Sequence, residues 1–268
     1  MNKRLHAAAE ENGTTQSLAA VPGTGTLAIA DPRTFTPYPP PLPGTSGKKN
    51  GIAKAARREP ALTKDALYVI RKDHGYHVVA ESYFYKTEPY YTILSLEYRG
   101  EVVKPSSRAV LEAYVIPVCL ERVRARGIPV CDWGISQAYV PLPALIYGLN
   151  YYATNAEYAV VRDNSAAKER IRHITNNGKY PFCFQKFPEG GEIAEYTAIF
   201  GKTVDPRPDV AACASAVYDL FGLPLVRMIF IRHDGSCLLS SLSPVHYSRL
   251  DEQERAILAA HICSQEFL

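Results

Sequence analysis

The chain has 268 residues, of which 47% are hydrophobic, so it can bury one sizeable core. Its formal net charge is +3, and the first 60 residues alone carry eight Lys or Arg against four Asp or Glu, which leaves the remainder near neutral. This balance argues against a nucleic-acid-binding face. Because the sequence offers neither an apolar run long enough to span a bilayer nor the apolar centre of a signal peptide, we expect a soluble, cytoplasmic protein without membrane partners.

The six cysteines are scattered, with no CxxC pair and no histidine at metal-ligand spacing. We interpret them as buried, reduced thiols and predict no metal site; a zinc site or a disulfide framework is the less favoured alternative. They are Cys119, Cys131, Cys183, Cys213, Cys237 and Cys263.

Residues 1–60 are poor in large apolar side chains and rich in Gly, Pro, Thr and Ala. Such a segment cannot bury enough surface to offset the loss of chain entropy, so we predict a disordered, basic tail. The proline run at 35–44 and the basic patch at 47–59 could contact partners, but a passive tail is the favoured interpretation. Residues 61–268 are expected to form a single domain.

The folded part begins with two predicted strands, at 66–73 and 76–86, joined by a turn at His74-Gly75. Six aromatic residues follow closely within 80–101. A helix over 90–98 is expected after Pro89, with one helical face formed by Tyr91, Leu94, Ser95 and Tyr98. Arg99-Gly100 ends this helix, and a short strand follows up to Lys104-Pro105.

The next segment has the spacing of a helix that begins at a Ser106 or Ser107 cap and ends at Gly127. Pro117 removes a helical hydrogen bond, so the sequence predicts a kink or two short helices. The predicted buried stripe consists of Val110, Leu111, Tyr114, Val115, Val118 and Val123.

Strands are expected within 127–135, within 138–162 and at 180–187, and residues 192–202 are predicted to pair with the last of these as an antiparallel neighbour. Between them, Asp163 caps a helix that buries Ala167, Ile171 and Ile174.

The last third predicts a helix at 209–222, then strands at 225–232 and 237–245 joined by an Asp-Gly turn. Asp251 and Glu254 have capping-box spacing ahead of a final helix. The expected fold is α/β (α+β), with mixed β-sheets and packed helices behind the disordered tail.

Two stretches carry recognisable motifs. The first contains Ser82, Tyr83, Tyr85, Tyr90, Tyr91, Glu97, Arg99 and Gly100. The second contains Phe200, Gly201, Lys202, Leu220, Phe221, Pro224, Leu225, Arg227, Phe230, Arg232, Ser241 and Pro244. Both stretches resemble the domain found N-terminal to RimK-like ATP-grasp ligases. The sequence departs from the family pattern at Glu81, Pro89, Ile93 and Glu101, and residues 103–190 lie outside the resemblance.

The resemblance implies a link to carboxylate–amine ligases, which hold Mg²⁺ and ATP phosphates with carboxylates and lysines. In a divergent ATP-grasp interpretation of 105–250, Gln185-Lys186-Phe187 would be the adenine-side hinge and Glu192 a ribose ligand. The slots for phosphate and metal are instead occupied by Leu145-Ile146-Tyr147, Leu239-Ser240-Ser241 and Ile229. We therefore expect no cofactor, with ATP and Mg²⁺ only if the divergent interpretation holds.

No nucleophile elbow, P-loop, metalloprotease or Rossmann signature is present in the folded part, so no catalytic residue is assigned. The expected function is a stand-alone accessory or substrate-presenting protein whose catalytic ATP-grasp subunit is a separate polypeptide. The alternatives are an enzyme acting on amino-acid or peptide-like substrates, which would be an ATP-grasp-related ligase, and a scaffold that uses the proline run.

A small amino-acid or peptide-like ligand could be held by phenol hydroxyls and opposite charges. The candidate substrate-binding residues are Ser82, Tyr83, Tyr85, Tyr90, Tyr91, Glu97, Arg99, Lys104, Lys202 and Arg227. The competing interpretation is that these tyrosines merely bridge core and solvent.

Overall fold

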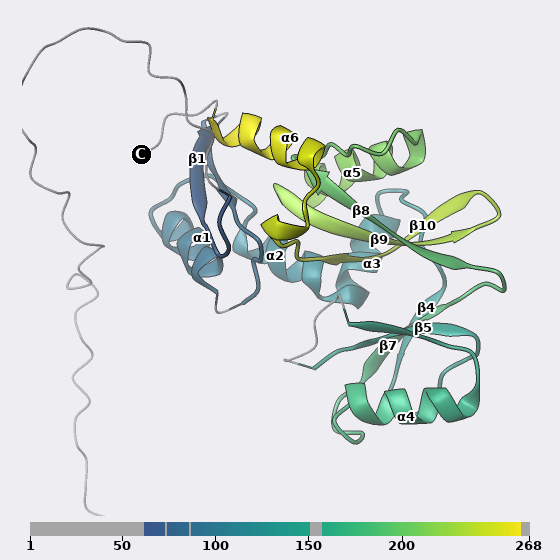
Figure 1. Ribbon diagram of the computed structural model, residues 1–268. Coiled ribbons are helices and arrows are strands. Elements are labelled where there is room, and N and C mark those ends of the chain that lie inside the picture. Colours follow the sequence, from purple (N-terminus) through teal and green to yellow (C-terminus); the bar gives the residue numbers. More distant parts are fainter. Residues whose placement is uncertain (1–61, 73, 86, 151–156, 264–268) are drawn as a thin grey trace, which may run out of the picture. The chain divides into compact units, whose positions relative to one another are not determined.

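The computed structural model describes residues 62–263, apart from 73, 86 and 151–156 (Figure 1). The chain divides into two units, Met1–Lys54 and Ala55–Leu268. The first unit lies wholly outside the described residues, and so does the predicted disorder of residues 1–60. In the described part, three sheets and six α-helices form the expected mixed α+β fold.

The first sheet contains β1 (Tyr68–Lys72), β2 (Gly75–Val79) and β3 (Val103–Lys104). β1 and β2 form an antiparallel hairpin, and β3 runs parallel to β2. The predicted strand over 76–86 is too long, because β2 ends at Val79. Beyond it the backbone makes loop contacts instead: the Ala80 N–H donates to the Tyr83 hydroxyl at 3.1 Å, and the Val245 N–H donates to the Glu81 carbonyl at 3.1 Å.

The expected helix after this loop is confirmed as α1 (Glu88–Tyr98). It buries Tyr90, Ile93 and Leu96, whereas Tyr91 and Tyr98 are 57% and 87% exposed. The face selected from the spacing is therefore largely the solvent face. Two sets of residues on this helix, offset by one position, both have helical spacing. The set that contains Ile93 is the one that enters the core.

The predicted break at Pro117 is confirmed by two short helices, α2 (Ser107–Tyr114) and α3 (Ile116–Arg124). The Ser106 hydroxyl accepts the Ala109 N–H at 3.1 Å and caps α2 as expected. Three members of the predicted buried stripe are 40–44% exposed, namely Leu111, Val115 and Val118. Because of the break, α2 and α3 have different axes and bury different faces. A single continuous apolar stripe therefore cannot describe both helices.

The four-stranded sheet has the order β4-β7-β5-β6, and all its strands are antiparallel. The strands are β4 (Trp133–Ser136), β5 (Ala144–Gly148), β6 (Tyr158–Val161) and β7 (Phe182–Lys186). β4 begins later than the strand predicted within 127–135, where Val130 makes an isolated bridge with Leu239.

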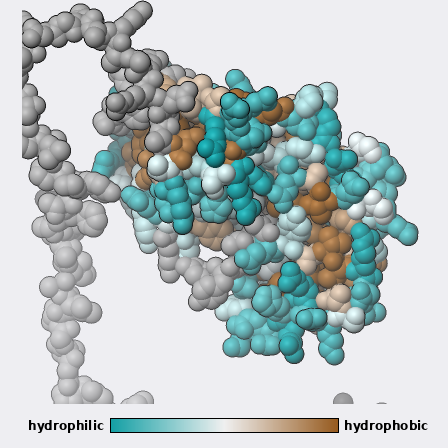
Figure 2. Space-filling model, in the orientation of Figure 1, coloured by the Kyte–Doolittle hydropathy of each residue, from teal (hydrophilic) through white to brown (hydrophobic). Residues whose placement is uncertain are grey.

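Side chains on the two faces of this sheet enter different clusters, as alternation along a strand requires. Ala144 and Ile146 pack under α4 (Asn164–Ile174), while Leu145 and Tyr147 pack with Ile116 and Leu120 of α3. Figure 1 shows α4 along one face of the sheet, and Figure 2 shows that the outward surface in this region is mainly hydrophilic.

The C-terminal sheet has the order β10-β9-β8 and is antiparallel. Its strands are β8 (Glu192–Ile199), β9 (Leu225–His233) and β10 (Ser236–Ser243). The predicted pairing of 192–202 with 180–187 is wrong. Both edges of β7 are taken by β4 and β5, so β8 pairs along its eight residues with β9 instead.

The remaining elements are α5 (Pro208–Phe221), a short 3-10 helix at Tyr247–Arg249 and α6 (Glu252–Cys263). The predicted Asp-Gly hairpin turn is confirmed, with positive φ at both Asp234 (47°) and Gly235 (75°). The capping box is also confirmed: the Glu254 N–H donates to Asp251 Oδ1 at 2.7 Å, and the Asp251 N–H donates to Glu254 Oε2 at 3.0 Å.

All six cysteines are free, and four of them are buried. Burial raises the pKa of Cys131 to about 11 and that of Cys183 to about 12, so these thiols stay protonated near neutral pH. Within the described ranges, no helix combines the length and apolar character needed to cross a membrane.

Candidate functional site

The predicted tyrosine set divides between core and surface. Tyr83 is fully buried, and burial raises its pKa well above the ordinary value. Tyr90 is also buried and packs edge-to-face with Tyr85, with ring centroids 5.9 Å apart. Tyr85 and Tyr91 are 47% and 57% exposed, so these two can reach a ligand from solvent.

Of four further candidates, two connect structural elements and two lie at the ends of elements or in a loop. Glu97 Oε1 accepts the Ser107 N–H at 2.9 Å at the first residue of α2, and Arg99 is the exposed C-cap of α1. The Ser82 hydroxyl accepts the Phe84 N–H at 3.3 Å. Arg227 forms a 3.1 Å ion pair with the Glu195 carboxylate across β8 and β9.

The last two candidates, Lys104 and Lys202, enter a group that we call the basic cluster. It consists of four basic side chains around two aromatic rings: Lys72, Lys104, Lys202, His261, Phe200 and Tyr218. Lys72 and His261 could not be predicted as members of the cluster, because no local spacing in the sequence connects β1 with α6.

A second polar group joins the four-stranded sheet to the C-terminal sheet. The Tyr147 hydroxyl lies 2.6 Å from the Ser240 hydroxyl, and the Ser241 hydroxyl donates to it at 3.1 Å. Gln185 Nε2 donates to the Ser240 carbonyl at 2.8 Å. All four side chains are fully buried, and burial raises the pKa of Tyr147 well above its usual range.

These residues occupy the positions where the sequence analysis looked for phosphate and metal ligands. Mg²⁺ requires oxygen ligands, commonly carboxylates, and nucleotide phosphates require positive charge. The side chains found there are the protonated Tyr147 phenol and the two serine hydroxyls, each hydrogen-bonded to that phenol, together with buried Ile229. No group of three or more metal-ligating side chains occurs among the residues with described positions. These side chains therefore present no charge to a magnesium ion or a phosphate group.

The residues considered above for adenine and ribose contacts interact with other side chains of the protein. Phe187 is buried, and the Arg162 guanidinium lies 5.4 Å from its ring centroid. Glu192 forms a 3.7 Å ion pair with Arg232. Apolar side chains complete the contact between the two sheets, among them Leu145 and Ile231.

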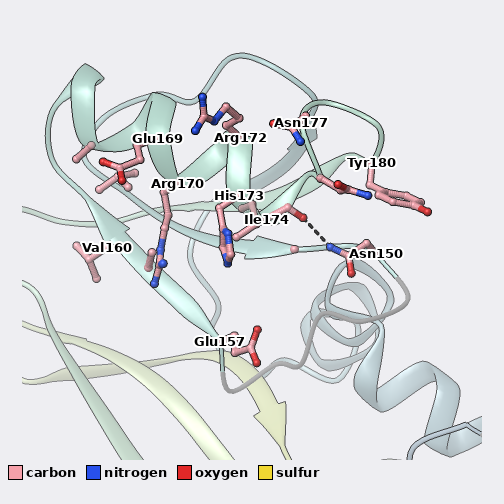
Figure 3. Close-up of a pocket in the computed structure, with 15 residues that line it drawn as sticks. Asn150, Glu157, Val160, Glu169, Arg170, Arg172, His173, Ile174, Asn177 and Tyr180 are labelled. Carbon is pink, nitrogen blue, oxygen red and sulfur yellow. Dashed lines mark hydrogen bonds between the residues drawn. The ribbon is translucent and has the colours of Figure 1, made fainter.

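A hollow of about 1000 Å³ lies on the α4 side of the four-stranded sheet (Figure 3). Figure 3 shows Arg170 and His173 pointing from α4 into the opening, with Glu157 on the opposite side. Asn150 Nδ2 donates to the Ile174 carbonyl at 2.7 Å at one end. The lining carries charges of both signs and defines no particular ligand class.

Comparisons with known proteins confirm the resemblance over part of the chain. The family model for the RimK-like ATPgrasp N-terminal domain matches residues 168–261. This range contains the second resembling stretch, from Phe200 to Pro244, and excludes the first. No curated protein matches the chain.

One solved ATP-grasp structure shares the fold over about two thirds of the chain, and others are similar at lower scores. The RimK domain protein ATP-grasp from Sphaerobacter thermophilus DSM 20745 matches with a TM-score of 0.50 at 14% identity, covering 66% of this chain and 77% of that one. The ATP-grasp ligase PsnB, complexed with precursor peptide PsnA2 and AMPPNP, matches at 0.48 and 18%, covering 65% of this chain. The D-alanine–D-alanine ligase from Bacillus anthracis complexed with ATP matches at 0.48 and 13%, covering 65% and 73% of the two chains. This chain spans 64% of the PsnB chain.

Proposed function

We propose that this chain is a non-catalytic relative of the ATP-grasp ligases and serves a carboxylate–amine ligase system as an accessory or substrate-presenting protein. The observation that carries the proposal is the buried contact of Tyr147 with Ser240 and Ser241. In this proposal, hydroxyl groups bonded to each other have replaced the charged groups that a nucleotide and its metal need.

Energetics support a closed contact between the two sheets. Admitting a nucleotide would separate apolar side chains such as Leu145, Phe187 and Ile231, all of which are at most 2% exposed. Burial of each such side chain contributes roughly 1.5–3 kcal/mol, so opening the contact would cost several kcal/mol before any ligand is bound. The side chains of Tyr147, Ser240 and Ser241 would offer Mg²⁺–ATP no charge in return.

An accessory role requires catalysis elsewhere, and we propose a separate ATP-grasp subunit as the partner, in the cytoplasm. The ligand in this proposal is an amino acid or a peptide. The exposed candidates Tyr85, Tyr91 and Arg99 would contact it.

Nucleotide binding tests the proposal directly. Full-length protein is titrated with ATP and Mg²⁺ by calorimetry, with a catalytically active ATP-grasp ligase as the positive control. We expect no magnesium-dependent binding at concentrations up to about 1 mM, the upper range of ordinary enzyme KM values. Clear magnesium-dependent binding would overturn the proposal in favour of a divergent ligase, to be assayed for amino-acid ligation.

The accessory role has a separate test. An ATP-grasp ligase encoded beside this protein is assayed for ligation with and without the full-length chain. A rise in turnover that depends on the chain supports the role. If turnover is the same without it, the accessory role is refuted even when nucleotide binding is absent.

A further inference from the structure

The basic cluster is assembled from five parts of the chain. Lys72 ends β1, Lys104 ends β3, and Phe200 and Lys202 belong to the turn after β8. Tyr218 comes from α5 and His261 from α6. Because so many elements converge, the rigid fold fixes the cluster, and no flexible loop places it by itself.

The turn after β8 is tightly determined. Phe200 and Gly201 have φ values of 49° and 75°, and the backbones of Ile199 and Lys202 exchange hydrogen bonds at 2.7 and 2.9 Å. A Cβ on Gly201 would lie 2.9 Å from the Tyr218 Cβ. A left-handed phenylalanine costs of order 1 kcal/mol or more, and such outliers concentrate at functional positions.

Aromatic rings hold the basic groups near one another. The Lys72 and Lys104 ammonium nitrogens lie 5.4 Å and 5.9 Å from the Phe200 and Tyr218 ring centroids. The two rings are 6.0 Å apart between centroids, and His261 stacks on Phe200 at 4.3 Å. Contacts between ammonium groups and ring faces orient the lysines without neutralising their charge.

The three lysines form no ion pair within the described part of the chain. The ion pairs found there involve arginine or histidine, and none involves Lys72, Lys104 or Lys202. Burial, and then the positive charges of Lys72 and Lys202, lower the pKa of His261. Several positive charges therefore act on one small region, and such a field attracts anions.

We propose that the basic cluster binds a multivalent oxyanion, either a phosphoryl group or a pair of neighbouring carboxylates on one ligand. A lysine ammonium is a point charge with three rotatable donors, and it adapts to oxyanions without a fixed bidentate geometry. A single carboxylate would leave two of the three lysine charges uncompensated. The inference does not depend on the proposed accessory function, because it uses no residue of the Tyr147 contact.

Pyrophosphate is the probe for this site. Full-length protein is titrated with pyrophosphate by calorimetry, with the ionic strength held at about 0.1 M by chloride so that general screening stays constant. We expect saturable binding that weakens at least about fivefold in each of Lys72→Met, Lys104→Met and Lys202→Met, the effect of losing one charged contact. Lys179→Met, at an exposed lysine in the turn after α4, is the matched control and should bind like the wild type.

Two further arms define the ligand and guard against misfolding. Citrate tests the carboxylate source: binding of both probes supports a general oxyanion site, and binding of pyrophosphate alone supports a phosphoryl site. Lys202→Arg keeps the charge and should retain affinity within about threefold. The proposal would be overturned if neither probe showed saturable binding. It would also be overturned if the three methionine variants, with unchanged circular dichroism, bound pyrophosphate as tightly as the wild type.

Discussion

Replacing Tyr147 with phenylalanine tests the buried contact between the two sheets. The change removes one hydroxyl and leaves the ring, so packing is preserved while two hydrogen bonds to Ser240 and Ser241 are lost. Each bond contributes about 1 kcal/mol, and leaving buried hydroxyls unsatisfied adds to the loss. We expect the free energy of unfolding to fall by about 2–3 kcal/mol and Tm to fall by roughly 5–10 °C.

Unfolding in guanidinium chloride measures this loss. The chain has a single tryptophan, Trp133 in β4, so its fluorescence reports on the four-stranded sheet, and circular dichroism follows the whole chain. Tyr158→Phe is the matched control, because Tyr158 is the cross-strand partner of Tyr147 but donates to Glu195 at an exposed 3.0 Å bond. The control should cost less than about 0.5 kcal/mol.

A double-mutant cycle separates the hydrogen bond from its surroundings. Ser240→Ala should cost about 1 kcal/mol less in the Tyr147→Phe background than in the wild type, since the bond is then already absent. If Tyr147→Phe is as harmless as Tyr158→Phe, or if the two changes at the contact simply add, the hydroxyl does not hold the sheets together. The Tyr147 contact would then not keep a nucleotide from entering between the sheets.

Three other perturbations check separate parts of the structure. Gly201→Ala should lower the free energy of unfolding by about 1–3 kcal/mol, because a positive φ and a close Cβ contact both oppose the methyl group. Gly190 also has a positive φ but faces open space, so Gly190→Ala should cost only about 1 kcal/mol in the same denaturant assay. Asp251→Ala removes half of the capping box and should cost about 0.5–2 kcal/mol in thermal unfolding. Burial and neighbouring lysines hold the pKa of His261 in the folded state below its ordinary value of 6.5. The stability that neutral His261 contributes is therefore present above pH 6.5, and it is lost as the pH falls through the pKa of the folded state. Lys202→Met should raise this pKa, measured by proton NMR titration, and a pKa that does not move would show that the two side chains are not close.

Local features of the structure follow from residues that lie within four positions of one another. The Ser106 cap, the helix break at Pro117, the turn at Asp234-Gly235 and the capping box at Asp251 were all predicted correctly. Each depends on backbone geometry and hydrogen bonds inside a single turn, where the chain has few alternatives. Of the two resembling stretches, only the second lies inside the matched family range.

Pairings between distant segments needed the tertiary structure. The predicted pairing of β8 with β7 was wrong, because an alternating strand can pair with any free strand edge. Only the fold shows that β4 and β5 already flank β7, so that β8 pairs with β9. The choice of buried face on α1 depended in the same way on what packs against the helix.

The two groups with the most chemical content are also non-local. Tyr147 and Ser240 are 93 positions apart, and Lys72 meets His261 only because β1 and α6 both reach the turn after β8. Spacing along the chain carries no information about such contacts, since they arise from burial of separate apolar faces in a common core. The sequence therefore determined most of the elements, their caps and their turns, and the packing of those elements decided which polar groups meet.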